Sequence, residues 1–319
     1  MKRIGATVLL TGAGCLALAV AAFVALRGTE GVKTVHLGGA GPAGGPAPAT
    51  VDSVRPDLRI AVAAMISPKS TRKYYEDLLR VVGARLGESV VFLQRRTYAE
   101  VNDLLRRKEV DLAFVCSGPY ITGRREFGME LLAVPVVHGQ KVYHSYILVG
   151  NDSSVERFGD LRGGRFAFTD PHSNTGCLVP RFMLARLGET PESFFEQTFF
   201  TGSHDNSIKA VAEGLADAGA VDSLIWEFLN AVDPTYTART RIVEKSPPYG
   251  IPPVVVHPDL PAERKERLRK VFLQLHEDRE ASVLLGELRI ERFGEGDDSM
   301  YDSVREMQAW LAGRAHAKS

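Results

Sequence analysis

The chain has 319 residues and 45% of them are hydrophobic, which is enough for one large domain or for two lobes that each bury a core. Lysine plus arginine and aspartate plus glutamate both number 39, so the formal net charge is zero. This balance argues against a nucleic-acid-binding protein, because no basic excess is available to neutralise phosphates.

The N-terminal segment differs from the rest of the chain. Lys2 and Arg3 precede an uncharged run at 4–26, which Arg27 closes. The run is long enough to span a bilayer, so we predict a transmembrane anchor over 1–27 with the remaining chain outside the cytoplasm. A cleaved signal is the alternative, because small residues at 17–22 suit a peptidase. Residues 28–56 contain GGAGPAGGPAP and are predicted to form a flexible linker.

Strands and helices are expected to alternate from residue 57. The apolar patterns predict strands at 58–64, 90–93, 111–115, 131–137 and 143–149, and helices at 71–86 and 98–107. A second series has strands at 165–168, 194–200, 218–221, 241–244 and 254–257. Its helices are expected at 155–161, 176–187, 206–214, 224–230, 263–276, 282–288 and 302–311.

This alternation predicts an α/β fold with two lobes, each a mostly parallel sheet flanked by helices. We expect lobe 1 to comprise 57–148 and 248–319, and lobe 2 to comprise 149–247. The two crossing segments near Val149 and Pro247 are the expected hinges. A ligand cleft is expected between the lobes, because ligands bind beyond the carboxyl ends of strands in such sheets.

Small or polar residues follow five of the expected strands. They are Ser67 after the first strand; Cys116, Ser117 and Tyr120 after the third; Ser173, Asn174, Thr175 and Gly176 after the strand at 165–168; Ser203, His204 and Asp205 after the strand at 194–200; and Asp222 after the strand at 218–221. The repetition of such residues at strand ends predicts one shared ligand site.

The loop at 173–176 has the composition of an anion site. Hydroxyls and an amide stand before an expected helix, where backbone N–H groups and the helix dipole favour negative charge. The alternative is an ordinary helix N-cap, for which the same residue types are preferred.

The remaining candidates also have two interpretations. His204 can donate a ring proton to an anion or be a core histidine. Asp222 can accept a proton from a protonated oxyanion or cap the next helix. Tyr120 can close over a ligand or pack in the core, and Cys116 can be a soft ligand or a small buried residue. Cys116 and Cys177 can also pair as a disulfide, which sequence leaves undecided.

Three stretches carry a resemblance to a known family. They are VDLAFVCSGPY at 110–120, DLRGGRFAFTDPHSNTG at 160–176 and FTGSHDNSIKAVAEGLADAGAVDS at 200–223. Over 57–276 the chain resembles the solute-binding proteins of phosphate, phosphite and phosphonate ABC transporters, which have the type II periplasmic binding-protein fold.

The resemblance implies particular ligand contacts. Ser173 and Thr175 match hydroxyls of the family loop, whereas Asn174 stands where that loop has a further hydroxyl. His204, Tyr120 and Asp222 match other family contacts. The family's tyrosine near the first strand end has no counterpart among Met65, Ile66 and Ser67.

The sequence therefore predicts a periplasmic or extracytoplasmic binding protein, tethered by residues 4–26, that delivers a small oxyanion to an ABC-transporter permease. No catalysis, cofactor or metal is expected. A sensor of an oxyanion such as arsenite, working with a membrane histidine kinase and using Cys116, is the alternative. A hydrolytic triad of Ser173, His204 and Asp222 is disfavoured, because the chain has no GxSxG elbow.

Overall fold

The computed structural model describes residues 34–37 and 57–317, with side chains placed from residue 57 to residue 314. The predicted anchor at 4–26 lies outside the described residues, as does most of the predicted linker. Strand β1 (Thr34–Leu37) falls inside that linker and pairs antiparallel with β3 (Ser89–Gln94), so the linker prediction is wrong for this stretch. Within the described ranges, no helix is both long and apolar enough to cross a membrane.

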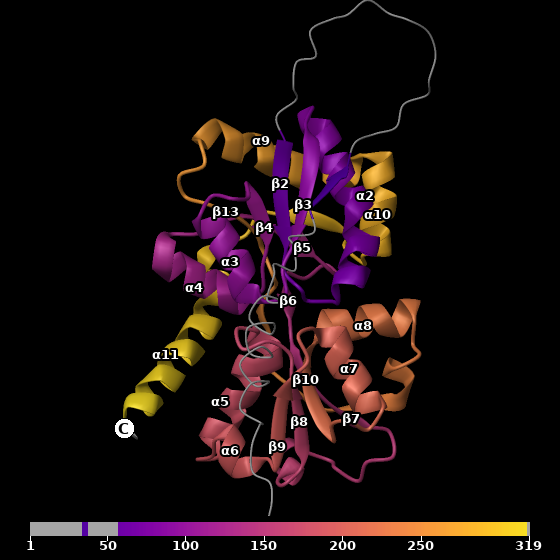
Figure 1. Ribbon diagram of the computed structural model, residues 1–319, viewed down its shortest axis with the longest axis vertical. Coiled ribbons are helices and arrows are strands. Elements are labelled where there is room, and N and C mark those ends of the chain that lie inside the picture. Colours follow the sequence, from indigo (N-terminus) through magenta and orange to yellow (C-terminus); the bar gives the residue numbers. More distant parts are fainter. Residues whose placement is uncertain (1–33, 38–56, 318–319) are drawn as a thin grey trace, which may run out of the picture. The chain divides into compact units, whose positions relative to one another are not determined.

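Residues 57–317 form two α/β lobes, each with a central sheet covered by helices on both faces (Figure 1). The first lobe has a seven-stranded sheet with the order β1-β3-β2-β4-β13-β5-β14. Its remaining strands are β2 (Asp57–Val62), β4 (Leu112–Phe114), β5 (Glu130–Val136), β13 (Val254–Val256) and β14 (Arg292–Gly294).

Strand β2 shows how the first sheet divides its core. Leu58, Ile60 and Val62 pack against the face covered by α2 (Pro68–Leu86), α9 (Ala262–Leu273) and α10 (Arg279–Glu287). Ala61 and Ala63 point to the face covered by α3 (Tyr98–Arg106), α4 (Ser117–Phe127) and α11 (Asp302–Ala317). This alternation follows from the two-residue period of a strand, and it fixes the direction in which β2 delivers Met65 and Ser67.

The second lobe has a five-stranded sheet with the order β11-β7-β10-β8-β9. The strands are β7 (Ser145–Gly150), β8 (Arg165–Phe168), β9 (Gln197–Phe200), β10 (Ala218–Asp222) and β11 (Thr240–Lys245). One face packs against α5 (Val179–Arg186) and α6 (Pro191–Phe194), and the other against α7 (His204–Ala212) and α8 (Ser223–Val232). Short 3-10 turns are η1 (Phe158–Leu161), η3 (Thr237–Arg239), η4 (Leu275–Glu277) and η5 (Asp298–Tyr301).

The two-lobed α/β prediction is confirmed, but both sheets are mixed rather than mostly parallel. Strand β13 runs antiparallel to β4 and β5, and β7 runs antiparallel to β10 and β11. Each of these strands follows a crossing between lobes, so it enters its sheet from the cleft edge and runs opposite to the strands that end there.

The crossings form a small ribbon in which β6 (Val142–Tyr143) pairs with β12 (Tyr249–Gly250). The His144 ring nitrogen Nδ1 lies 2.8 Å from the Ser246 carbonyl oxygen, which ties the two segments together. The predicted boundary at 148/149 is wrong, because it falls within β7, whose pairing lies in the second sheet. The first crossing is at 142–145.

Helix α4 was not expected from the sequence. Gly118, Pro119 and Gly123 weaken its helical pattern, but Pro119 lies in the first turn, where it is tolerated. Gly123 packs so closely that a Cβ atom there would lie 2.3 Å from the Met129 methyl carbon. Because α4 begins at Ser117, Cys116 and Ser117 form a helix start rather than a loop. Similarly, α6 replaces the start of the strand expected at 194–200.

Candidate functional site

Four helix starts meet between the lobes. Ser117 begins α4 of the first lobe, while in the second lobe η2 (Asn174–Leu178) precedes α5, His204 begins α7, and Asp222 precedes α8. The side chains of Ser117, Asn174, Thr175 and His204 are all fully buried. We refer to Ser117, Tyr143, Asn174, Thr175 and His204 as the donor cluster.

Tyr143 of the crossing ribbon lies at the centre of the donor cluster. Its hydroxyl makes a short hydrogen bond with the Ser117 hydroxyl and accepts one from the Asn174 amide nitrogen at 3.1 Å. The Cys116 sulfur is 3.6 Å from the same hydroxyl. Tyr143 thus links both lobes and the hinge through a single phenolic group.

Three polar atoms of the donor cluster are buried without a hydrogen-bond partner among the described residues. They are the Asn174 amide oxygen, the Thr175 hydroxyl oxygen and the His204 Nε2 atom. Native proteins leave few buried polar groups unpaired, because each costs roughly 1–3 kcal/mol. Three in one cluster therefore point to a polar ligand that completes them.

The tautomer of His204 follows from its surroundings. The Asp222 backbone N–H donates to His204 Nδ1 at 3.1 Å, and the Thr169 hydroxyl lies 3.1 Å from the same nitrogen. Burial lowers the pKa of His204 to about 3, so the ring is neutral near pH 7. A neutral ring that accepts at Nδ1 carries its proton at Nε2, which makes the unpartnered atom a hydrogen-bond donor.

Asp222 is a buried carboxyl group beside the donor cluster. Burial raises its pKa to about 7, although the Leu224 N–H that it caps opposes this shift. Asp222 is therefore the N-cap of α8, and this role does not exclude contact with a ligand. The pKa of Tyr143 lies well above its usual value, first because of burial and then because of Cys116 and Asp222, so its hydroxyl keeps its proton.

The loop at 173–176 caps a helix and also carries unpartnered polar atoms. The Ser173 hydroxyl oxygen accepts the Gly176 N–H at 3.0 Å, as an N-cap does. Gly176 has a packing role, because a Cβ atom there would lie 2.5 Å from the Thr169 side chain and 3.1 Å from the His204 ring. Ser173 and Gly176 thus shape the loop, while Asn174 and Thr175 carry the unpartnered atoms.

Two predicted site residues lie elsewhere. The Tyr120 hydroxyl donates to Asp298 at 2.7 Å, and its ring packs against Tyr301 at a centroid distance of 4.6 Å. The structure therefore gives Tyr120 the core role that was its alternative, because α4 turns this side chain toward η5. Ser67 precedes α2, where its hydroxyl donates to Ser70 at 3.1 Å.

Ser67 belongs instead to a set of hydrogen bonds that hold the lobes together. Its N–H donates to the Asp205 carboxylate at 2.9 Å, and the neighbouring His204 N–H donates to the Met65 carbonyl at 3.0 Å. On another element, the Tyr98 N–H donates to Asp170 at 3.2 Å. These contacts connect strand ends and helix starts of opposite lobes, so the structure corresponds to a closed form.

Both described cysteines are free and buried. Burial raises the pKa of Cys116, which sits at the edge of the donor cluster, and burial likewise raises the pKa of Cys177 to about 11. The structure therefore contains no bond between them, and both thiols are protonated near neutral pH.

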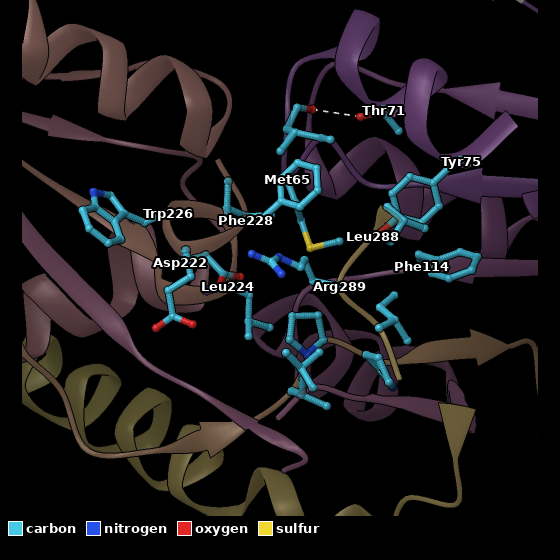
Figure 2. A pocket seen from close by; sticks show the side chains of 18 of the residues that line it. Met65, Thr71, Tyr75, Phe114, Asp222, Leu224, Trp226, Phe228, Leu288 and Arg289 are labelled. Carbon is cyan, nitrogen blue, oxygen red and sulfur yellow. Dashed lines mark hydrogen bonds between the residues drawn. The ribbon is translucent and has the colours of Figure 1, made fainter. Parts of the chain in front are cut away.

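A cavity of about 350 Å³ adjoins the donor cluster between the lobes. Figure 2 shows Met65, Tyr75 and Phe114 on one side of it and Leu224 and Phe228 on the other. Asp222 also lines this cavity, which is otherwise mainly apolar. None of the five donor-cluster residues is among its lining residues.

Sequence reasoning missed Tyr143 and Tyr98 as site residues. Tyr143 opens an apolar run, and its pattern predicts only a strand residue. The signal that could have found it is the general need of a buried tyrosine hydroxyl for a partner. Tyr98 is fully buried beside Ser173 and Cys116, which its position at a predicted helix start did not reveal.

Comparisons with known proteins place the chain in a family. The sequence model of a family described as the periplasmic substrate-binding protein of phosphonate ABC transporters matches residues 60–301. The phosphate-import protein PhnD of Mycolicibacterium smegmatis is 30% identical over 181 residues, which cover 52% of this chain and 56% of that protein. The phosphonates-binding periplasmic protein of Escherichia coli is 22% identical over 82% of this chain and 78% of its own length.

Solved structures of the same fold are also similar. A binding protein component of an ABC phosphonate transporter from Pseudomonas aeruginosa superposes with a TM-score of 0.76 at 23% identity, covering 80% of this chain and 86% of that one. PhnD1 from Prochlorococcus marinus, solved in complex with methylphosphonate, gives 0.73 at 21% identity, covering 80% and 98%. The family match extends over most of the two lobes, and the chain belongs to the periplasmic substrate-binding proteins of phosphonate ABC transporters.

Proposed function

We propose that this protein captures a small phosphorus oxyanion, such as a phosphonate, phosphite or phosphate, and presents it to an ABC-transporter permease. The observation that carries the proposal is the donor cluster, in which three fully buried polar atoms lack partners among the described residues. Membership of the family implies an extracytoplasmic location, a small ligand and a permease as partner.

In this proposal the anion is held by neutral donors rather than by ion pairs. His204 donates from Nε2, Thr175 donates its hydroxyl, and the dipoles of the helix starts favour the negative charge. Ser117 and Tyr143 supply further hydroxyls. Hydrogen bonds from neutral donors to a charged group stabilise by about 1.5–3 kcal/mol each, so a few of them suffice without a cationic side chain.

Asp222 gives the site a preference among protonation states. As a carboxylate it accepts a hydrogen bond from a singly protonated anion and repels an anion without a proton. The unpartnered Asn174 oxygen is an acceptor too and favours the same ligand form. We therefore expect the monoanion of a phosphonate or phosphate to be bound in preference to sulfate, which has no proton at neutral pH.

The arrangement favours binding over catalysis. Ser173 uses its hydroxyl oxygen as a helix cap, and His204 Nδ1 is occupied by a backbone N–H, so neither is arranged as a nucleophile and its general base. The raised pKa of Cys116 keeps its thiol protonated and makes it a weak ligand for trivalent arsenic, which gives no support to a sensor of arsenite.

Isothermal titration calorimetry tests the proposal. The purified protein is titrated with methylphosphonate, phosphite, phosphate and sulfate at pH 7, and we expect binding of at least one of the first three and none of sulfate. His204→Asn keeps an acceptor near the Nδ1 position but removes the Nε2 donor. It should weaken binding about 10- to 100-fold, as expected for losing one hydrogen bond to an anion.

His257→Asn is the matched control. His257 is also buried and also accepts a backbone N–H at Nδ1, from Asp259 at 3.1 Å, but it lies in the first lobe away from the donor cluster. Its variant should bind as the wild type does. Absence of binding to all three phosphorus oxyanions, or equal effects of the two histidine variants, would contradict the proposal.

A further inference from the structure

The cavity beside the donor cluster suggests which members of the ligand class the protein takes. It shares two residues with the surroundings of the cluster. Asp222 lines the cavity, and its backbone N–H donates to His204. Met65 also lines the cavity, and its carbonyl oxygen accepts the His204 N–H. When the oxyanion of a ligand lies in the donor cluster, the rest of that ligand therefore lies directly beside the cavity.

The cavity is far larger than a methyl group needs. Its volume of about 350 Å³ lies within the range of roughly 300–1,000 Å³ that is usual for small-molecule pockets. By comparison, a water molecule occupies about 30 Å³ in the liquid. Methylphosphonate would leave most of this space without ligand atoms.

The walls of the cavity are apolar and come from both lobes. Tyr75, Phe114 and Leu288 belong to the first lobe, whereas Leu224 and Phe228 project from α8 of the second (Figure 2). An apolar group between them would lose contact with water against both lobes at once. Such burial adds affinity and favours the closed form in which the two walls face each other.

Few polar groups of the lining are open to a substituent, and the Tyr75 hydroxyl, whose pKa burial raises to about 12, is one of them. The Thr71 hydroxyl already donates to the Ile66 carbonyl at 3.0 Å, and Glu227 accepts the Tyr146 hydroxyl at 2.6 Å. His138 and Arg289 are exposed lining residues, and the Arg289 guanidinium lies between the two walls (Figure 2), where it disfavours a cationic substituent. Among the lining residues, Asp222 is the only buried one with a carboxyl group.

We propose that the cavity receives the apolar organic substituent of a phosphonate whose oxyanion lies in the donor cluster. This inference rests on the proposed function and narrows it from phosphorus oxyanions in general to phosphonates with an alkyl or aromatic group larger than methyl. Each methylene that the cavity buries should improve affinity by up to roughly fourfold.

Calorimetry with a graded series of ligands tests the proposal. Methyl-, n-butyl-, phenyl- and 2-aminoethylphosphonate have the same head group and differ in their substituents. We expect n-butyl- and phenylphosphonate to bind at least tenfold more tightly than methylphosphonate, and 2-aminoethylphosphonate to bind no more tightly than methylphosphonate. Equal affinity for the methyl and butyl compounds, or tightest binding of the amine, would overturn the proposal.

A cavity-filling variant supplies the second arm. Leu288→Trp should weaken binding of n-butyl- and phenylphosphonate at least tenfold and leave methylphosphonate within twofold of the wild type. Val283→Trp, on the exposed side of α10, is the matched control and should change neither. If Leu288→Trp does not fold, the wild-type series decides alone.

The outcomes separate this inference from the proposed function. Binding of methylphosphonate without any gain from larger apolar groups would refute the inference and leave the proposed function standing. A series in which no phosphonate binds, together with no binding of phosphate or phosphite, would refute both.

Discussion

The donor cluster and the apolar cavity lie side by side between the lobes, yet they are built in different ways. Apart from Tyr143, the cluster is assembled from residues at helix starts, and backbone hydrogen bonds such as that from Asp222 to His204 fix its geometry. The cavity is formed by side chains from distant segments, including α2, α8 and the end of α10. The first kind of site follows from local sequence, whereas the second depends on how complete elements pack.

The donor cluster and the cavity also differ in how binding depends on charge. The donor cluster excludes water and presents polar atoms, so a charge introduced there affects binding strongly. The cavity presents mainly carbon atoms, and its effect depends on the area that is buried. Asp222 borders both regions, and its carboxyl group marks the boundary between them.

The largest effect is expected from a negative charge inside the donor cluster. Asn174→Asp places a carboxylate next to the bound anion, and such like-charge contacts cost several kcal/mol. Affinity for methylphosphonate should fall by roughly 100-fold or more in calorimetry. Asn151→Asp makes the same change at an exposed turn and should have no effect. Comparable affinities for the two variants would show that the cluster does not hold the anion.

The boundary residue Asp222 should make stability depend on pH. Its folded pKa of about 7 exceeds the usual value of 3.8, so the folded state is favoured when the group is protonated. This favourable contribution is complete below about pH 4 and is lost as the pH rises toward 7. Between pH 5 and pH 8 we expect a loss of roughly 2–3 kcal/mol in the free energy of unfolding.

Urea unfolding at pH 5 and pH 8 measures this effect. His204 has the opposite sign, because its lowered pKa removes stability as the pH falls below about 6.5, so the comparison must be made between variants. In Asp222→Asn, the loss of stability that Asp222 causes as the pH rises should be absent, whereas the effect of His204 should remain. Identical pH dependence in the wild type and Asp222→Asn would contradict this account of the boundary.

A moderate effect is expected from the bonds that close the lobes over both regions. Asp205→Ala removes the carboxylate that accepts the Ser67 N–H across the cleft. Losing this hydrogen bond should weaken ligand binding about tenfold, mainly through faster dissociation in stopped-flow measurements. Asp103→Ala, on the exposed surface of α3, serves as the control. An unchanged dissociation rate in Asp205→Ala would mean that this bond does not stabilise the closed form.

The smallest effect on binding is expected at Tyr120. Its hydroxyl is bound to Asp298 outside both regions, so Tyr120→Phe should leave the affinity for methylphosphonate within twofold. The lost hydrogen bond should lower the free energy of unfolding by about 1–2 kcal/mol, measured by urea unfolding. A large loss of affinity without a loss of stability would return Tyr120 to the ligand site.

These contrasts explain what the sequence could and could not predict. The alternation of strands and helices predicted two lobes, and polar residues at strand ends predicted the approach of Asn174, Thr175 and His204. The antiparallel strands β7 and β13 were missed, because residue patterns carry no strand direction. Helix α4 was missed because its glycines and proline resemble a loop, and with it the packing of Tyr120 against Tyr301.

Tyr143 and the cavity could not have been found in the same way. Tyr143 reaches the donor cluster from the crossing ribbon, where its position depends on the pairing of β6 with β12. The cavity needs the packing of both lobes. Sequence predicted residues whose role follows from a local turn, and it missed residues whose role follows from contacts between elements.

The central claim is that the neutral His204 ring donates its Nε2 proton to a bound oxyanion. Nuclear magnetic resonance of protein labelled with ¹⁵N-histidine, assigned with His204→Asn, tests it directly at pH 7. We expect a neutral ring with its proton on Nε2, and a marked shift of this proton and nitrogen when methylphosphonate is added. A ring protonated on Nδ1, or Nε2 signals that do not respond to a saturating ligand, would contradict the account.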